Sequence, residues 1–263
     1  MNEYFVSISI LNFNNAKFLN RSIKSCLNQS YKKIEVLVYD DKSTDDSIAI
    51  LKKYKNKKEN IFYNSSNKIN IAAIDAKNGY YNLIKFSKGK IIFLLDSDDF
   101  FKKNKVKEFI KIYKKNSQIN FIQDLPAIYS KRKQKIKNKN NVLSFWPYLA
   151  PESCISFRKN FFIDFKKKNK SFENNFKDVW FGFRLGVFAY FKDKSFYSLN
   201  KNLTTYKSYG ESKKYTLFNL NWFSRRLNSF YYLKKIDQHA INLNFNFDYF
   251  LTKIISTTLK CFK

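Results

Sequence analysis

The sequence has little histidine, cysteine, glycine or proline. Its 263 residues include 1 His, 3 Cys, 5 Gly and 3 Pro. Because zinc sites are built mainly from several His and Cys ligands, the single histidine, His239, argues against one. Cys26, Cys154 and Cys261 lie far apart and form no CxxC pair, which indicates reduced thiols in a cytosolic compartment.

Long apolar runs are also lacking. Runs such as Ile91 to Leu95 are far shorter than the roughly 20 residues that a helix needs to cross a bilayer. The first residues, Met1 to Phe5, show neither the basic region nor the apolar stretch of a secretory signal. We therefore expect a cytoplasmic protein, with peripheral attachment at the inner face of the cell membrane left open.

Positive charge is in large excess. Lys and Arg total 50 against 21 acidic residues, a formal net charge of +29, which is typical of proteins that bind nucleic acid or an anionic surface. No RNP, helix-turn-helix or zinc-finger signature accompanies it, so we expect no specific nucleic-acid partner. Part of the excess is consistent with an AT-rich coding sequence, and the remainder still attracts phosphate-bearing ligands and anionic lipid headgroups.

The first half of the chain alternates between strand-like and helix-like segments. Strands are predicted over residues 5–11, 34–39, 61–63 and 91–95, with helices between and after them. Asn14 or Asn15 is available to cap the first helix, and residues 43–46 resemble a capping box that opens the second. This alternation predicts a parallel α/β sheet with ligands at the carboxyl ends of its strands.

The second half has a looser pattern. Residues 131–141 are polar and basic, which predicts a mobile loop or a hairpin tip, and aromatic residues dominate from 145 to 209. Two amphipathic helices are predicted over residues 217–234 and 248–262. Such basic, aromatic helices can lie on an anionic membrane or pack against the rest of the chain, and both interpretations stay open.

An acidic run, Asp96-Ser97-Asp98-Asp99, follows the predicted fourth strand. Three carboxylates within four residues cannot all stay ionised unless a cation or many hydrogen-bond donors offset their repulsion. Mg²⁺ or Mn²⁺ would supply that charge, bound through one or two carboxylates and the phosphate oxygens of a ligand. The alternative is a solvated turn in which an aspartate caps the next helix.

Two stretches of the sequence resemble the nucleotide-binding half of the family-two glycosyltransferases. They are SISILNFNNAKFLNRSIKSCLNQSYKKIEVLVYDDKSTDDS, from Ser7, and GKIIFLLDSDD, from Gly89. The resemblance implies a GT-A fold, which is a Rossmann-like, mostly parallel sheet flanked by helices. It implies a GT-A domain over residues 1–212, with a nucleotide-binding half (1–115) and an acceptor half (116–212). Residues 213–263 would form a C-terminal helical extension.

The same resemblance implies roles for residues at the ends of the second and fourth strands. Asp41 would receive the imide of the nucleobase, and the backbone around Asn12 and Asn14 would line the base pocket. Asp96 and Asp98 match the DxD motif of the family. Asp98 would face the ribose or the metal, and a further aspartate, Asp99, would ligate the metal that holds the diphosphate.

Asp178 is the candidate catalytic base. The segment from Phe176 to Phe181 resembles the "ED" segment of the family, whose aspartate is the general base, although Lys177 replaces the usual glutamate. A carboxylate within hydrogen-bond reach can take the proton of an attacking hydroxyl. The alternative role for Asp178 is that of a helix N-terminal residue favoured by the helix dipole.

The segment from Leu203 to Ser212 resembles the late "YRxHxxSxS" loop of the family. Tyr209 stands where many members have a metal-contacting histidine, and Lys207 takes the basic position, where it would neutralise the departing diphosphate. Trp146 and Trp180 have two interpretations: stacking on a sugar ring, or packing in the core, which is the commoner fate of tryptophan.

The resemblance therefore implies an inverting, metal-dependent hexosyltransferase. We expect it to move a sugar from a nucleoside diphosphate donor, UDP for preference, to a hydroxyl of a polysaccharide or lipid-linked oligosaccharide. Mg²⁺ or Mn²⁺ is the expected cofactor. Lys177 and Tyr209 motivate an alternative, a glycosyltransferase-like module that binds nucleotide or carbohydrate without turnover.

Overall fold

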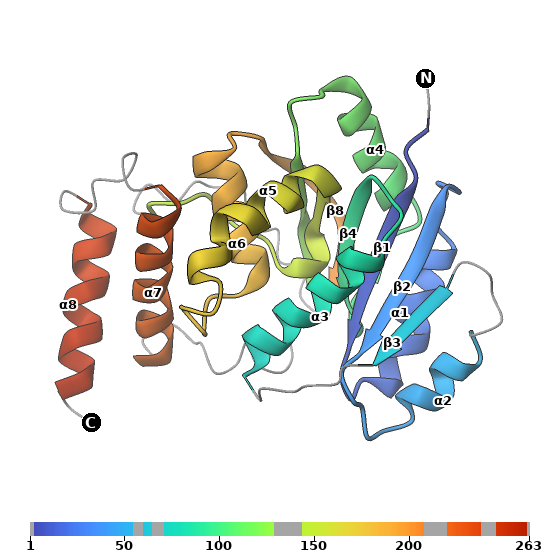
Figure 1. The fold of residues 1–263 in the computed structure, drawn as a ribbon, viewed down its shortest axis with the longest axis horizontal. Coiled ribbons are helices and arrows are strands. Elements are labelled where there is room, and N and C mark those ends of the chain that lie inside the picture. The colour runs from blue at the N-terminus through green and yellow to red at the C-terminus, as the bar shows by residue number, and fades with distance from the viewer. Residues whose placement is uncertain are drawn as a thin grey trace.

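The computed structural model describes residues 3–54, 60–64, 71–128, 144–207, 220–237 and 246–261. Within these ranges the strands form one sheet in the order β3-β2-β1-β4-β7-β6-β8-β5 (Figure 1). The strands are β1 (Val6–Asn12), β2 (Ile34–Asp40), β3 (Asn60–Asn64), β4 (Ile91–Asp96), β5 (Phe100–Phe101), β6 (Phe121–Ile128), β7 (Ile155–Arg158) and β8 (Phe196–Tyr206).

Helices flank this sheet and continue beyond one end of it (Figure 1). They are α1 (Ala16–Leu27), α2 (Ser47–Lys52), α3 (Ala72–Phe86), α4 (Lys105–Lys115), α5 (Lys159–Asn169), α6 (Phe181–Val187), α7 (Leu220–Ile236) and α8 (Phe247–Cys261). The four predicted strands and the helices between them are confirmed. The loop predicted over residues 131–141 and the first residues of the helix predicted from 217 lie outside the described ranges.

The parallel part of the sheet explains why the early strands are so apolar. β1 pairs in parallel with β2 and with β4, and residues of all three strands are almost completely buried. Strands covered by helices on both faces are buried on both faces, and even the polar side chains of Ser7, Ser9 and Glu35 in these strands are buried. The register places Leu11 beside both Tyr39 and Asp96, and the carboxyl ends of three strands therefore meet at one edge.

Separate apolar clusters cover the two faces of the sheet. On one face, side chains of α1 and α4 such as Ile23 and Phe109 pack on β1 and β4. On the other, side chains of α3, α5 and α6 such as Leu83, Phe165 and Leu185 pack on β2, β4 and β7. A third cluster joins α6 to α7, and α8 packs along α7.

The predicted helix caps are wrong in detail. Asn15 does occupy the N-cap position of α1, but its side chain donates to Ser97 Oγ at 3.1 Å instead of capping the helix. Residues 43–46 form no capping box. Asp45 accepts from Ala16 N at 2.8 Å and from Ser47 N at 3.0 Å, so one carboxylate satisfies donors at the start of both α1 and α2. A local pattern could not foresee a cap shared between two loops.

Within the described part of the chain, no helix combines the length and the apolarity needed to cross a membrane.

Candidate active site

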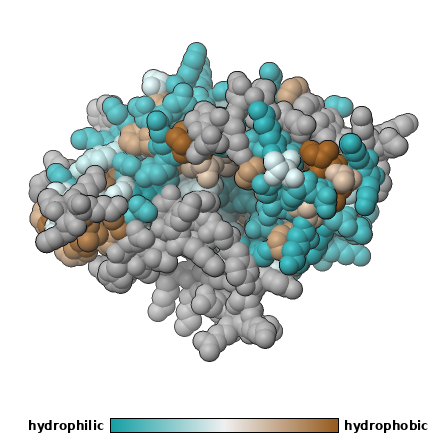
Figure 2. Space-filling model, turned by 90° about the horizontal axis from the view of Figure 1, so that it is seen from below, coloured by the Kyte–Doolittle hydropathy of each residue, from teal (hydrophilic) through white to brown (hydrophobic). Residues whose placement is uncertain are grey.

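A cleft of about 1110 Å³ lies at the edge where β1, β2 and β4 end. Its sheet-side wall includes Asp41, Asp96 and Asp98, and its opposite wall comes from residues 146–152, the start of α6, and α7. The face of the molecule seen in Figure 2 is hollowed near its middle. The cleft therefore brings the two predicted acidic clusters together and sets an aromatic wall against them.

The loops after β1 and β2 are joined to each other beneath the cleft. Asn12 is fully buried and donates to Asp40 Oδ2 at 2.6 Å. Asn14 has a positive φ of 49°, and its Oδ1 accepts from Thr44 N at 2.8 Å. The side chains of Asn12 and Asn14 thus brace the neighbouring loop, while Asp41 lines the cleft itself.

The acidic run after β4 is held from several sides. Tyr80 Oη donates to Asp96 Oδ1 at 2.7 Å, and Asp96 N donates to Ser153 Oγ at 3.0 Å. Burial, followed by the charges of Glu152, Asp99 and Asp98, raises the pKa of Asp96 well above its usual range. Burial also raises the pKa of Asp98, with Lys207 and Arg21 opposing the shift. Several carboxyl groups that resist ionisation are therefore crowded at this corner.

Asp99 differs from its neighbours because it lies below the surface. It is 1% exposed, it is not among the residues that line the cleft, and its Oδ1 accepts from Lys207 N at 2.7 Å. Burial, and then the charge of Asp98, raises the pKa of Asp99 to about 7. Its Oδ2 is buried and has no hydrogen-bond partner in the described part of the chain. Asp99 thus ties the acidic run to the segment that follows β8.

Lys207 belongs to that segment and lines the cleft beside Asp98. Its ammonium lies 3.0 Å from the ring centroid of Phe18. Desolvation lowers the pKa of Lys207, an effect that Asp98 opposes and that Lys17 and Arg21 reinforce. Lys207, for which the sequence predicts the role of basic residue of the site, therefore lies in the cleft.

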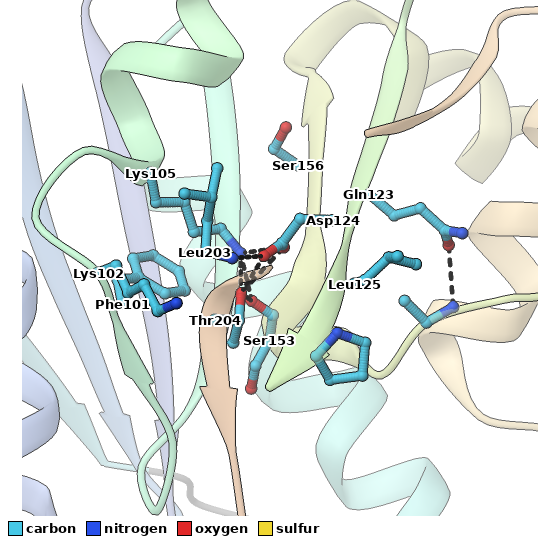
Figure 3. Close-up of polar contacts among 12 residues, drawn as sticks. Phe101, Lys102, Lys105, Gln123, Asp124, Leu125, Ser153, Ser156, Leu203 and Thr204 are labelled. Atoms are coloured by element: carbon cyan, nitrogen blue, oxygen red, sulfur yellow. Dashed lines mark hydrogen bonds and ion pairs between the residues drawn. The ribbon is translucent and has the colours of Figure 1, made fainter. Parts of the chain in front are cut away.

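A buried polar network supports the acidic run from behind (Figure 3). Lys105 and Asp124 are both completely buried, and Lys105 Nζ donates to Asp124 Oδ1 and to the carbonyl of Ser153, each at 2.8 Å. Thr204 Oγ1 lies 2.5 Å from the same ammonium. Because Ser153 Oγ also accepts from Asp96 N, the network connects α4, β6 and β8 to the cleft.

Asp178 lies on the loop before α6. Asn228 Nδ2, from α7, donates to both of its carboxylate oxygens at 3.0 Å. Asp178 is partly buried and does not itself line the cleft, whereas the next two residues, Val179 and Trp180, do. Arg184 fixes this loop by donating to the carbonyls of Glu173, Asn175, Phe176 and Val179 at 2.9 to 3.0 Å.

Several cleft residues were missed from the sequence. Glu152 belongs to the short 3-10 helix η1 (Glu152–Cys154), and its Oε1 accepts from Gly182 N in the first turn of α6 at 2.9 Å. Burial raises the pKa of Glu152. Trp222 and Arg225 reach the cleft from α7. The sequence around Glu152 matches no known motif. The basic, aromatic composition of α7 suggested contact with a membrane, and so its residues in the cleft were not predicted.

Comparison with known proteins places these features in a family. The family model described as "Glycosyl transferase family 2" matches residues 7–199. An uncharacterized glycosyltransferase of Haemophilus influenzae is 35% identical over 118 residues, covering 44% of this chain and 45% of the relative. The Escherichia coli protein WfaP, "UDP-Glc:alpha-D-GlcNAc-diphosphoundecaprenol beta-1,3-glucosyltransferase", is 32% identical over 125 residues, covering 48% of this chain and 44% of the relative. The chain thus spans less than half the length of these curated relatives.

Solved structures with a similar fold include other glycosyltransferases. TarS 1-349 of S. aureus, in complex with UDP-GlcNAc, superposes with a TM-score of 0.64 at 16% identity, over 97% of this chain and 71% of TarS 1-349. The mannosyltransferase PcManGT of Pyrobaculum calidifontis, in complex with GDP-Man and Mn²⁺, gives 0.60 at 10% identity, over 99% of this chain and 76% of PcManGT. These neighbours confirm the predicted GT-A fold, and the mostly parallel sheet of this chain is flanked by helices as expected.

The family match begins in β1, includes the acidic run and ends within β8. It therefore includes most of the residues that meet at the carboxyl edge of the sheet and most of the opposite wall. The chain belongs to glycosyl transferase family 2.

Proposed function

We propose that the chain transfers a hexose from a nucleoside diphosphate donor to an acceptor hydroxyl, with inversion at the anomeric carbon. The observation that carries this proposal is the convergence of Asp41, Asp96, Asp98 and Lys207 on one cleft at the carboxyl edge of the sheet. Ligands of open α/β sheets bind at this edge. We also propose the division into a nucleotide-binding half (1–115), an acceptor half (116–212) and a helical extension (213–263).

The acidic corner fits a divalent cation. Among the described residues, no group of three or more His, Cys, Asp or Glu side chains could hold a metal by itself. In Mg²⁺ and Mn²⁺ sites of the proposed kind, one or two carboxylates and the phosphates of a substrate share the ion. Two observations support this proposal: burial and then the neighbouring carboxylates raise the pKa of Asp96, and the buried Oδ2 of Asp99 has no hydrogen-bond partner among the described residues. Asp98 lines the cleft and is the first ligand we propose, with Asp99 as the second.

The bound ion would offset the negative charge that develops on the departing diphosphate. Lys207, from the segment after β8, would add a cation on the same side of the cleft. Asp41 would accept the imide N–H of the nucleobase, and the braced loops over Asn12 and Asn14 would keep that pocket rigid. Uracil carries such an imide, and guanine offers a comparable ring N–H. UDP is proposed because WfaP uses a UDP-linked donor and TarS binds UDP-GlcNAc.

Asp178 is proposed as the general base that takes the proton of the acceptor hydroxyl. Its two hydrogen bonds from Asn228 would hold the carboxylate in one orientation. Glu152 is the competing carboxylate because it lines the cleft directly. Matched variants Asp178→Asn and Glu152→Gln decide between them. If transfer survives in Asp178→Asn and is lost in Glu152→Gln, Glu152 is the base.

The acceptor is proposed to be a polysaccharide or a lipid-linked oligosaccharide. WfaP acts on a diphosphoundecaprenol-linked sugar by name. TarP of Staphylococcus aureus, named a poly(ribitol-phosphate) β-N-acetylglucosaminyltransferase, is 32% identical over 118 residues, covering 43% of this chain and 34% of TarP. Acceptors of both kinds carry phosphate, which suits a chain with a net charge of +29.

We further propose peripheral contact with an anionic membrane through α8, at the inner face of the cell membrane. Its outward side exposes four large apolar residues at helical spacing: Phe247 64%, Phe250 60%, Leu251 44% and Ile254 47%. Hydrophobic surface is visible at this end of the molecule in Figure 2. Such a helix can bury its apolar face at the headgroup boundary. Flotation with vesicles containing anionic lipid tests this, and Phe250→Ser with Ile254→Ser should abolish binding.

The proposed function is tested by UDP release from a panel of UDP-sugars, with and without Mn²⁺. Wild-type protein should consume at least one donor with metal, and Asp178→Asn should bind UDP while consuming none. A second candidate is a module that binds without turnover. It is favoured by Lys177, which replaces the glutamate of the "ED" segment. It is also favoured by Asn228, whose side chain donates to both carboxylate oxygens of Asp178. Tight metal-dependent UDP binding with no donor consumed would establish that module.

A further inference from the structure

All three tryptophans of the chain, Trp146, Trp180 and Trp222, line the same cleft. They arrive from the segment before η1, from the start of α6 and from the first turn of α7. Large apolar side chains grouped in a concave site are the usual lining of a ligand pocket. The wall of the cleft opposite Asp96 and Asp98 is therefore rich in aromatic side chains.

Two of these indoles are held by neighbours within the protein. The Arg226 guanidinium lies 4.5 Å from the ring centroid of Trp146 and 5.3 Å from that of Trp222. Trp146 also packs on Phe230 and Phe183, at 4.6 and 5.2 Å between centroids, and Trp222 packs against Phe223 at 4.8 Å. Trp146 and Trp222 therefore have a structural explanation.

Trp180 has none of these contacts. Its indole is only partly buried, and within the described ranges it makes no ring stacking, cation–π contact or side-chain hydrogen bond. An open aromatic face and an unused N–H are what aromatic residues offer at binding surfaces. Core packing, the commoner fate of tryptophan, therefore does not account for Trp180.

The backbone that carries Trp180 is fixed. Its carbonyl accepts from Arg184 N at 3.1 Å, and the Arg184 guanidinium binds four carbonyls of the preceding loop. The indole is therefore held on an ordered support, two residues beyond Asp178. On the proposed function, the acceptor binds in the same cleft as the donor, and Trp180 lines that cleft.

We infer that Trp180 is the platform of an acceptor subsite that takes a pyranose ring, with the apolar C–H face of the sugar stacked on the indole. This inference rests on the proposed function and narrows its acceptor to a cyclic sugar. An open-chain polyol phosphate has no flat apolar face to place on an indole.

Kinetics on Trp180→Ala and Trp180→Phe test the inference, with Phe86→Ala as a control for removing a surface aromatic from α3, 42% exposed and outside the cleft. Octyl hexopyranosides and ribitol 5-phosphate serve as acceptor probes. Trp180→Ala should raise the pyranoside KM about tenfold, the scale of one lost aromatic contact. The donor KM should not change, and Trp180→Phe should fall between Trp180→Ala and wild type.

Three results would overturn the inference. The first is an unchanged pyranoside KM in Trp180→Ala, and the second is a rise in the donor KM of that variant instead of the pyranoside KM. The third is efficient use of ribitol 5-phosphate by both wild type and Trp180→Ala. Tryptophan fluorescence gives a readout that needs no turnover. Octyl pyranosides should change the emission of wild type and of Trp222→Phe, whereas Trp180→Ala should need about tenfold more pyranoside to reach half of its emission change.

The two proposals fail separately. If no donor is consumed, the transferase proposal fails, and the fluorescence titration still decides whether Trp180 binds a pyranose. If donors are consumed and Trp180→Ala binds the pyranoside as tightly as wild type, only the platform is refuted.

Discussion

Replacing Lys105 with methionine would measure how strongly the acidic corner depends on the buried network behind it. Lys105 and Asp124 are both completely buried, and the Lys105 ammonium donates to Asp124, to the Ser153 carbonyl and to Thr204. Methionine keeps the approximate length of the side chain and removes the charge. Asp124 would then keep only its bonds from Leu203 N and Thr204 Oγ1.

Leaving one member of a buried ion pair uncompensated costs about 3–5 kcal/mol. For a chain of this size that corresponds to a fall in melting temperature of about 6–20 °C. Replacing both partners, as in Lys105→Met with Asp124→Asn, leaves no orphaned charge. We therefore expect the double variant to be about 1–3 kcal/mol more stable than the sum of the two single losses predicts.

The loss of unfolding free energy in Lys105→Met should also depend on pH. Burial already raises the pKa of Asp124, and Lys105 is the largest opposing influence. Removing Lys105 raises that pKa further, so the fold carries an acid that resists ionisation. Its contribution to stability is intact below the unfolded pKa of about 4 and is lost as pH rises through the higher folded pKa. The deficit relative to wild type should therefore widen between pH 5 and pH 8.

Chemical denaturation of the four proteins of this cycle, at pH 5 and pH 8, gives the free energies of unfolding. UDP binding at a temperature where all four are folded reports on the acidic corner. A strictly additive cycle, or a Lys105→Met deficit that narrows as pH rises, would refute the reasoning.

Three further predictions concern the rest of the fold. A methyl group at Gly89 would meet the backbone nitrogen of Ser7, so Gly89→Ala should lower the free energy of unfolding by about 1–3 kcal/mol. Gly79→Ala, which meets only the ends of the Leu11 and Tyr39 side chains and gains helix propensity, should cost clearly less in the same denaturation assay. Burial raises the pKa of Cys26 to about 12 and raises that of Cys154 as well. Iodoacetamide at pH 8 should therefore label these two thiols only after the protein unfolds, as detected by mass spectrometry. Labelling of either thiol in the native protein would contradict this. Hydrogen bonds from Lys111 and Lys201 lower the pKa of Glu108 to about 2. Wild type should therefore have a higher free energy of unfolding than Glu108→Gln above pH 5, by at most about 1 kcal/mol, and this difference should disappear as pH falls toward 2. A difference that grows in acid would be inconsistent with the ion pairs.

The parallel half of the fold could be predicted because its signals are local. β1, β2 and β4 are short, mostly apolar runs, and each ends in a polar or acidic residue at the same edge of the sheet. The sheet geometry alone then brings Asp41 to Asp96 and Asp98. The resemblance to the family-two glycosyltransferases covers these same segments, and it supplied the expected roles of the three aspartates.

The opposite wall of the cleft could not be predicted in the same way. Glu152 reaches the cleft because η1 packs under α6, and Trp222 and Arg225 reach it because α7 folds back across residues 172–187. These contacts join segments distant in sequence, and no short pattern encodes them. The burial of Asp99 has the same origin, since it depends on Lys207 returning beside the acidic run.

The most direct test of the central claim is a crystal structure with UDP and Mn²⁺, with anomalous scattering used to locate the metal. The account predicts an anomalous peak in contact with the Asp98 carboxylate and the diphosphate, with the uracil ring beside Asp41. A well-ordered crystal at saturating UDP and Mn²⁺ with no peak at this corner would contradict it.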